Sequence, residues 1–378
     1  MNERRINIIT SVYSPEVGGP GVYLASLKEV LEKRGYAVAV LVRPGFFTLL
    51  SKIKNNDVVL AHATPKILLP VYIARFAKRF SLTIRIGGDF FWERAVEEGR
   101  YFGTLRDFYR SRNFQFPISN FQTSAPLRVA ILYWVMKFLL RRADAVVFTA
   151  SLLRDIYVPL FELDEKKVHT IMHPILELRP ISSSSTKSVI RNSQLNNSSQ
   201  TKSAIRLLYA GRFLKLKNLH MLLEVFAEAR KKHPNIHLTL IGEGPEGEAL
   251  KAISHKLKAG DAVIFKDPTS HDNILEEMSR SDLVVLPSLS EVSPNLLTDA
   301  LAAGAPVLAT QENGLYGIFK ESATWFNPMS KEDFSAKLEA LLVPGALDEL
   351  REKKKTHLQQ RTWSEVAEEY ENVFQQSV

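Results

Sequence analysis

The chain has 378 residues, more than one ordinary hydrophobic core organises, so its length predicts two domains. With 45% hydrophobic and 24% charged residues, the composition excludes an intrinsically disordered protein. The absence of cysteine excludes a disulfide scaffold and a cysteine-ligated metal, while the net charge of +8 raises the question of an anionic partner.

The amino-terminal half alternates short apolar segments with helical ones. Residues 6–11 are predicted as a strand that leads through the glycine-containing loop 14–21 into a helix over 22–34, which Gly35 ends. Further strands are predicted over 37–42, 58–61, 82–86 and 145–148. Strands that alternate with helices predict a parallel sheet covered on both faces.

Two apolar segments of this half bear on location. The first strand is interrupted by Asn7 and followed by a turn, so we expect no secretion signal there. Residues 129–136 are apolar but end at Lys137, short of the about 20 residues that cross a bilayer. The wider segment 127–142 is typical of a core helix or of a helix on a membrane surface. We expect a soluble, cytoplasmic protein, with the inner face of the membrane as the alternative location.

A polar segment rich in Ser, Asn, Thr and Gln divides the chain. We therefore predict a first domain at 1–180, a linker or loop at 181–204, a second domain at 205–360 and a helix at 361–378 that packs towards the first domain. Strands of the second domain are predicted over 206–210, 237–241, 262–265, 283–286 and 306–310, with a helix over 219–233. The predicted fold is α/β, with two doubly wound parallel-sheet domains.

Charge is distributed unevenly between these halves. Residues 1–180 have 26 Lys and Arg against 16 Asp and Glu, a net +10, whereas residues 181–378 have 23 against 25, a net −2. A basic first domain favours membrane lipid, lipid phosphate or nucleic acid as a partner, and a solvated surface is the alternative. Nucleic acid is not expected, because the chain has no recognisable binding module.

Loops that follow strands are the expected ligand sites of such sheets. After the first strand of the second domain come Gly211, Arg212 and Lys217, just ahead of a helix. Helix N–H groups and these cations suit a diphosphate, and a solvated basic loop is the alternative. After the next strand come Gly242 and Gly244, which permit close backbone approach to a ligand or simply close the loop.

A later loop and its helix contain two carboxylates eight residues apart. Glu291 follows a strand, and Asp299 lies on the helix that begins near Pro294 and Asn295 and ends at Gly304. The helix amino terminus offers N–H groups to a phosphate, and carboxylates accept hydrogen bonds from sugar hydroxyls. The alternative is that Glu291 caps the helix and Asp299 is a surface residue.

Together these motifs resemble the donor half of glycosyltransferase family 4, whose members have the GT-B fold of two Rossmann-like domains. That family has a glycine-arginine loop followed by a lysine, a Gly-x-Gly-Pro turn, and a Glu-x7-Glu signature in a PS…E…PN…EA.A.G.PV.A setting. The same elements occur here in order over 207–310, with weaker similarity over 6–42 and at the final helix. The second Glu of the signature is Asp299 in this chain.

The resemblance implies a donor site in the second domain. Arg212 and Lys217 are expected to bind the donor diphosphate, Glu291 to contact the transferred sugar, and Asp299 to contact the ribose hydroxyls. Further donor contacts are implied for Gly18, Gly19, Gly211, Gly242, Gly244, Ser293, Pro294, Asn295 and Leu296. A tight turn is the alternative role of Gly18 and Gly19.

On the acceptor side the sequence departs from the family. Many relatives have a His near the segment 86–93, which follows a strand, but this chain has none there. We expect Asp89 or Glu93 to take that role. His62, after another strand, is a further candidate, although a lone His is more often structural.

The implied reaction is retaining transfer of a sugar from a UDP- or GDP-sugar to a glycan or lipid-linked acceptor. Because cations of the chain would neutralise the leaving group, we expect neither a metal nor another cofactor. Peripheral contact with an anionic membrane is a further expectation. The alternatives are a sugar-nucleotide epimerase, which needs acid and base groups converging on the hexose, and a catalytically weakened nucleotide-sugar-binding relative.

Overall fold

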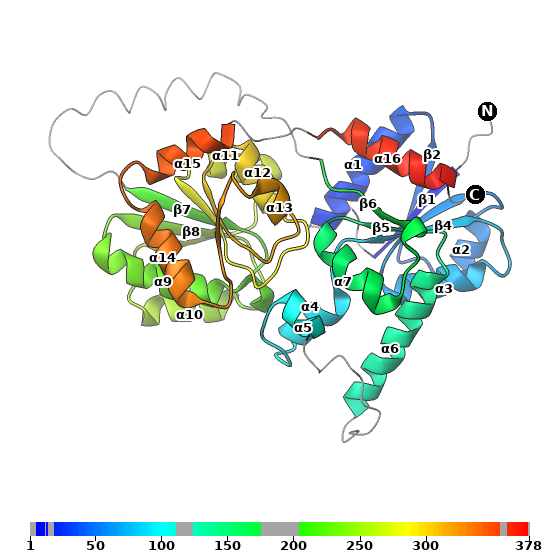
Figure 1. Cartoon of the computed structure of the whole chain (residues 1–378), viewed down its shortest axis with the longest axis horizontal. Helices are drawn as coiled ribbons and strands as arrows, with labels where there is room; N and C mark the ends of the chain where they lie inside the picture. The colour runs from blue at the N-terminus through cyan, green and yellow to red at the C-terminus, as the bar shows by residue number, and fades with distance from the viewer. Residues whose placement is uncertain are drawn as a thin grey trace. The chain divides into compact units, whose positions relative to one another are not determined.

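The structure, a computed structural model, describes residues 5–11, 13, 19–110, 124–174, 204–355 and 361–376 (Figure 1). The chain divides into two compact units. The first comprises Met1–Ala95, Leu105–Pro174 and Arg361–Val378, and the second comprises Val96–Thr104 and Ile175–Gln360. Of the predicted linker at 181–204, only Ala204 belongs to the described residues.

The sheet of the first unit is parallel, with the strand order β2-β1-β3-β4-β5-β6. The strands are β1 (Arg5–Thr10), β2 (Ala37–Val42), β3 (Val58–His62), β4 (Ser81–Ile86), β5 (Ala145–Phe148) and β6 (Val168–Thr170). The chain adds β2 on one side of β1 and then β3 on the other. This reversal places the topological switch point between β1 and β3, where ligands of doubly wound sheets bind.

Helices follow the strands of this unit in alternation. They are α1 (Gly19–Lys33), α2 (Phe46–Lys52), α3 (Pro65–Ala74), α4 (Phe90–Glu97), α5 (Leu105–Arg110), α6 (Ser124–Arg141), α7 (Ser151–Phe161) and the 3-10 turn η2 (Glu165–Lys167). Helix α1 begins at Gly19, three residues before the predicted start, because a proline is tolerated in the first turn of a helix. It ends at Lys33, and Gly35, with a φ of 92°, is the predicted glycine cap.

The last helix, α16 (Trp363–Gln376), belongs to the first unit and packs on α1 (Figure 1). The Tyr23 hydroxyl lies 3.4 Å from that of Tyr370, and Arg34 forms an ion pair with Glu371 at 2.6 Å. Buried side chains of both helices share one core cluster with Ile6 of β1. The end of the chain therefore covers the same face of the sheet as α1.

The second unit repeats this architecture with the order β12-β11-β10-β7-β8-β9, again parallel throughout. Its strands are β7 (Ile205–Ala210), β8 (Ile236–Ile241), β9 (Val263–Lys266), β10 (Leu283–Leu286), β11 (Val307–Thr310) and β12 (Thr324–Phe326). Two doubly wound parallel sheets confirm the predicted fold class. Here the switch point lies between β7 and β10.

The helices of the second unit cover its sheet between strands. They are η3 (Lys215–Lys217), α9 (Leu219–Lys232), α10 (Gly247–Lys256), α11 (His271–Ser279), α12 (Asn295–Ala302), α13 (Tyr316–Phe319), α14 (Lys331–Leu341) and α15 (Ala346–Lys355). The predicted core face of α9 is confirmed, since Leu219, Leu222, Leu223 and Phe226 are buried. Burial of each such side chain contributes about 2 kcal/mol, which anchors the loop ahead of the helix.

Candidate functional site

The two central strands of the second sheet bring the predicted donor motifs together. Strands β7 and β10 are parallel neighbours, so the loops that follow them leave the same edge of the sheet. The backbone N–H of Leu289 donates to the carbonyl of Leu216 at 2.9 Å, which ties one loop to the other. Segments far apart in sequence thus meet at the switch point.

Lys217 and Glu291 form an ion pair at this place. The Lys217 Nζ lies 2.6 Å from Glu291 Oε1, and the Ser288 hydroxyl donates to the same oxygen at 2.5 Å. The side chains of Lys217 and Glu291 are 22% and 13% exposed, so the pair is largely shielded from water. No described contact uses the second carboxylate oxygen of Glu291. The pair therefore combines a fixed cation with an acceptor that can still take a ligand hydroxyl.

The backbone around Glu291 is held by the loop after β11. Its N–H donates to the Glu312 carbonyl at 2.8 Å, and its carbonyl accepts from the N–H of Gly314 at 2.9 Å. Glu291 thus forms a parallel bridge with Asn313. This support makes the carboxylate a fixed feature of the loop and not a helix cap, because α12 begins only at Asn295.

Arg212 is exposed and lies two residues beyond β7. No ion pair of its guanidinium is found among the described residues, and its carbonyl accepts from the Tyr209 hydroxyl at 3.0 Å. Its predicted contact with a diphosphate stays a prediction. Lys217 is better fixed, since Asn218 in the left-handed region, at φ 52°, joins η3 directly to α9.

The two glycines that follow β8, which were predicted to lie in the donor site, support the loop after β7. A Cβ at Gly242 would lie 2.0 Å from the Gly211 carbonyl oxygen, and one at Gly244 would lie 2.4 Å from the Phe213 carbonyl oxygen. The Phe213 N–H donates to the Glu243 carbonyl at 2.8 Å, so the loops are in direct hydrogen-bonded contact. Only glycine permits this approach, and these residues therefore set the position of the chain that continues to Lys217.

The remaining donor-side residues gather at the start of α12. Pro294 is the N-cap position, Asn295 and Leu296 form the first turn, and the buried Ser293 Oγ has no hydrogen-bond partner among the described residues. Asp299 lies one turn further on and accepts from His271 Nε2 at 2.9 Å. This hydrogen bond raises the pKa of His271 above its usual value.

Ser288 and His271 are contacts that the sequence did not single out. Ser288 is the second residue after β10, at the expected ligand edge. His271 opens α11 after the loop that follows β9, 28 residues from its partner. Both residues follow a strand, where ligand-binding residues are expected, so the sequence could have indicated them. Nothing in the sequence linked His271 to Asp299.

Among the acceptor-side candidates, Asp89 is fully buried in the first unit. Its carboxylate accepts from the Tyr109 hydroxyl at 2.5 Å, the Tyr157 hydroxyl at 2.7 Å and the Trp92 N–H at 2.6 Å. Burial raises the pKa of Asp89, and these hydrogen bonds oppose that shift. Glu93 accepts from the Asp89 N–H at 3.2 Å. Both side chains thus stabilise the start of α4, and any acceptor contact of theirs stays a prediction.

His62 ends β3, directly opposite Arg85 of β4. Burial, and secondarily the Arg85 charge, lowers its pKa to about 4. Gly19 opens α1, while Gly18 lies outside the described residues. The structure therefore groups Lys217, Glu291 and the α12 residues in one unit and places Gly19, His62, Asp89 and Glu93 in the other.

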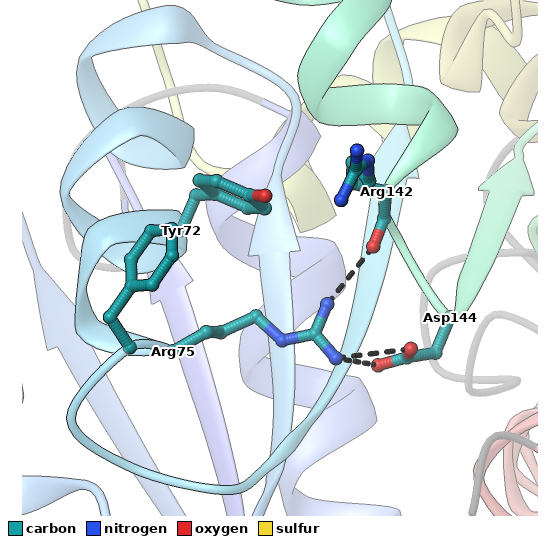
Figure 2. Close-up of a pocket in the computed structure, with 5 residues that line it drawn as sticks. Tyr72, Arg75, Arg142 and Asp144 are labelled. Carbon is teal, nitrogen blue, oxygen red and sulfur yellow. Dashed lines mark hydrogen bonds and ion pairs between the residues drawn. The ribbon is translucent and has the colours of Figure 1, made fainter.

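The first unit has a cavity of about 240 Å³ between α3 and the end of α6. Figure 2 shows residues that line it. Its Arg75 donates to the Asp144 carboxylate at 2.8 Å and to the Arg142 carbonyl at 3.0 Å. Asp144 immediately precedes β5, so the cavity lies at the amino edge of the sheet. Ligands of such sheets bind at the opposite edge. We therefore assign Arg75 a structural role and not a role in ligand binding.

A second cavity, of about 340 Å³, lies in the second unit at the carboxyl ends of β8 and β9. Ile241 and the segment Lys266–Thr269 contribute to its lining. This is the ligand edge of the sheet that also carries Lys217 and Glu291. Within the described part of the chain, no group of three or more His, Asp or Glu side chains could hold a metal ion, and no helix is long and apolar enough to span a membrane.

Residues 191–358 match the family model described as glycosyl transferases group 1. The alpha-monoglucosyldiacylglycerol synthase of Streptococcus pneumoniae is 24% identical over 324 residues, which are 81% of this chain and 70% of that protein. The phosphatidylinositol N-acetylglucosaminyltransferase gpi3 subunit of Schizosaccharomyces pombe is 24% identical over 212 residues. Those residues are 54% of this chain, which spans 46% of that relative's length.

Solved structures share the fold along the whole chain. Sucrose-phosphate synthase from Thermosynechococcus elongatus has a TM-score of 0.71 at 18% identity, with 99% of each chain covered. Anabaena HepE in complex with UDP has a TM-score of 0.70 at 14% identity, covering 98% of this chain and 99% of that one. At these identities the likeness concerns the fold. The matched model, the named relatives and the fold agree with the resemblance that the motifs carry, and residues 191–358 are similar to the group 1 glycosyl transferases.

Proposed function

We propose that the chain transfers a sugar from a nucleoside diphosphate sugar to an acceptor hydroxyl, with retention of configuration at the anomeric carbon. The observation that carries this proposal is the ion pair of Lys217 and Glu291 at the switch point of the second sheet. A cation for phosphate and a carboxylate for sugar hydroxyls lie there side by side. The complexes of Anabaena HepE with UDP and with UDP-glucose support a donor of this class.

Lys217 would hold the diphosphate, together with Arg212 and the N–H groups at the start of α12. In the ligand-free chain Glu291 holds the ammonium of Lys217 in place, at 2.6 Å. The diphosphate then adds a second anion to a cation that is already oriented. Such prior orientation lowers the cost of reorganisation in the transition state.

In the transfer step, the bond between the anomeric carbon and the diphosphate oxygen breaks while the acceptor oxygen forms its bond on the same face. The acceptor proton passes to the leaving diphosphate, so no protein nucleophile is required. Negative charge grows on the diphosphate beside Lys217 and Arg212. Positive charge grows on the sugar near the carboxylate of Glu291, which stabilises it. Retention is proposed on the family resemblance, and metal independence is proposed because these cations can neutralise the leaving group.

Asp299 would accept hydrogen bonds from the ribose hydroxyls. Its side chain is one methylene shorter than the Glu of the family signature, and His271 holds it at 2.9 Å. The Asp299 side chain is 16% exposed, so it can still meet a ligand. We assign His271 as the residue that positions Asp299.

The acceptor is proposed to be carried on a lipid at the inner face of the membrane. Helix α6 buries Tyr133, Met136, Leu139 and Leu140, as a core helix does, but it also exposes a second apolar face. The exposed apolar residues of α6, of its neighbour α3 and of the turn after α3 are Ile131, Trp134, Phe138, Leu69, Ile73 and Phe76. We call this set the α3–α6 face.

Basic side chains accompany the α3–α6 face. Lys137 Nζ lies 5.4 Å from the centre of the Trp134 ring, and the Arg142 guanidinium lies 5.3 Å from that of Phe138. Apolar residues flanked by cations are typical of a surface that binds anionic membranes. The names of the two relatives from Streptococcus pneumoniae and Schizosaccharomyces pombe, which contain a glucosyldiacylglycerol and a phosphatidylinositol, support a lipid acceptor.

The proposal is tested with a thermal-shift panel of UDP-, GDP- and ADP-sugars, followed by mass spectrometry of the products. We expect one nucleotide class to raise the melting temperature, and the matching sugar to be transferred or slowly hydrolysed with release of the nucleoside diphosphate. An epimerised donor would contradict transfer. Binding without turnover, in the presence of lipid acceptors, would indicate a weakened relative.

A further inference from the structure

Strand β4 presents polar side chains to a sheet face whose core is apolar. Its residues Ser81, Thr83 and Arg85 alternate with buried apolar ones. Thr83 lies in register with Leu60 and Ala145, which belong to the core cluster beneath α1 and α16. Parallel strands covered on both faces are normally apolar throughout. The Ser81 and Thr83 hydroxyls are buried, with no hydrogen-bond partner among the described residues.

Arg85 is the cation of this polar row and is only 4% exposed. Its Nη2 lies 3.0 Å from His173 Nε2, and its guanidinium lies 4.1 Å above the Tyr23 ring. Its buried Nε has no partner, and no carboxylate pairs with it, within the part of the chain that the structure describes. A buried cation without a counter-charge is unfavourable.

The two histidines beside Arg85 do not supply that counter-charge. A guanidinium only donates, so His173 Nε2 accepts and the ring is neutral. His62 lies opposite Arg85 in the register of β3 and β4, and its Nδ1 is buried without a partner among the described residues. Burial and the Arg85 charge lower the His62 pKa to about 4, so it is neutral at pH 7. Each neutral ring can donate or accept a hydrogen bond, but neither compensates the positive charge of Arg85.

The guanidinium lies close to the backbone that follows β4. A Cβ on Gly87, the second residue after Arg85, would lie 3.0 Å from Arg85 Nη1, and Gly87 is partly exposed. His62 and Arg85 stand at the carboxyl edge of the sheet, and His62 ends a strand of the switch point between β1 and β3. This is the edge where a ligand reaches a doubly wound sheet.

We propose that Arg85, with His62 and His173, binds a phosphate group carried by the acceptor substrate. The planar fork of a guanidinium matches two phosphate oxygens, and the neutral imidazoles offer further hydrogen bonds without adding charge. The phosphate would supply the counter-charge that Arg85 lacks. The assignment to the acceptor rests on the proposed function, whereas the presence of a phosphate site does not.

The test is calorimetric titration of the full chain with inorganic phosphate. Arg85→Gln is expected to weaken binding by at least tenfold, and Lys66→Gln, which removes an exposed cation of the same unit, to leave it unchanged. Binding should persist in Lys217→Met, which alters the proposed donor site instead. Phosphate binding that is lost in Lys217→Met and retained in Arg85→Gln would overturn the proposal.

Stability separates a ligand site from a structural role. Arg85→Gln should raise the melting temperature without phosphate, because it removes an uncompensated buried charge. A large fall would mean that a carboxylate of the chain pairs with Arg85, which would overturn the proposal. Should that variant misfold, Gly87→Ala keeps Arg85 and fills the adjacent space, and we expect it to weaken phosphate binding as well.

Two further titrations separate the outcomes. Binding of UDP to the unaltered chain tests the donor site alone, so its failure would contradict the proposed function and leave the phosphate result standing. Glycerol phosphate and phosphatidylglycerol vesicles distinguish a soluble phosphate from a lipid headgroup. The source that shows the larger dependence on Arg85 is the one that this site recognises, and the absence of any dependence on Arg85 with both would overturn the proposal.

Discussion

Glu291 and Asp299 belong to one sequence signature, but the structure gives them different surroundings. Glu291 is held by Lys217, Ser288 and the backbone of the β11 loop. Asp299 is held by a single side chain, His271, from another helix. The first arrangement fixes a charge pair away from water, whereas the second leaves a titratable partner half exposed. The two carboxylates therefore differ in how firmly the chain holds them.

The His271–Asp299 pair is predicted to make stability depend on pH. The folded pKa of His271 is raised above its usual value of 6.5 by Asp299. The pair therefore contributes fully below that value, and its contribution is lost as the pH rises through the raised pKa. Urea unfolding of the unaltered chain and of His271→Gln should differ more at pH 6 than at pH 9, by less than about 1 kcal/mol because His271 is half exposed. An equal difference at both pH values would contradict this.

Residue-level prediction from sequence succeeded where chain order dictates proximity. Lys217 and Glu291 follow strands of one parallel sheet, so their common edge was predictable before their contact was known. Asp299 and His271 come from separate helices, and Arg85 and His173 are 88 residues apart. Such pairs depend on packing that no local pattern encodes.

At the scale of elements, the β7 and β8 loops show how glycine supports a site that it does not touch. Gly242 has a φ of 140°, and the carbonyl of Gly211 occupies the place of its missing side chain. A backbone carbonyl cannot move away from an added Cβ as the end of a long side chain can. The Gly-x-Gly turn is therefore needed to hold the chain that continues to Lys217.

Gly242→Ala is predicted to destabilise the second unit by at least about 2 kcal/mol, because it combines a strained φ with a backbone clash. Gly247→Ala is the matched control, since Gly247 is the first residue of α10 and a Cβ there would meet only a side-chain atom, at 3.7 Å. Thermal unfolding of both variants, with donor binding, provides the measurement. Equal melting temperatures would show that the loops can separate at little cost.

Element prediction from the sequence failed chiefly for short or edge features. Strands β6 and β12 have three residues each, too few to show any periodicity, and they lie at the edges of their sheets. Helix α6 was predicted to be either a core helix or a surface helix, and its side chains show both characters. The identity of an apolar residue does not indicate whether a neighbouring helix will cover it.

At the scale of the whole molecule, the excess positive charge of the amino-terminal half can be related to features of the first unit. The half with the net +10 contains the α3–α6 face, with Lys137 and Arg142 beside its aromatic rings. It also contains Arg85, the buried cation of the proposed phosphate site. The second unit has the Lys217–Glu291 pair of the proposed donor site. Such a division suits a donor that is a soluble nucleotide and an acceptor that is an anionic lipid.

Replacement of Trp134 and Phe76 by alanine is predicted to weaken binding to phosphatidylglycerol vesicles by at least tenfold, because both side chains are exposed on the α3–α6 face, at 61% and 81%. Val343→Ala, which removes an exposed apolar side chain of the second unit, should leave binding unchanged. Co-sedimentation at low and high salt measures both. Binding by the double variant equal to that of the unaltered chain would remove the α3–α6 face as the membrane contact.

The proposal as a whole depends on Lys217 and Glu291 acting on a nucleotide sugar. The most direct measurement is kcat/KM for the preferred donor in Lys217→Met, with Lys215→Met as the control, because Lys215 is an exposed lysine of the same turn. We predict a fall of about 10² to 10³ for Lys217→Met and a change within a few fold for Lys215→Met. Unaltered turnover by a folded Lys217→Met variant would contradict the account.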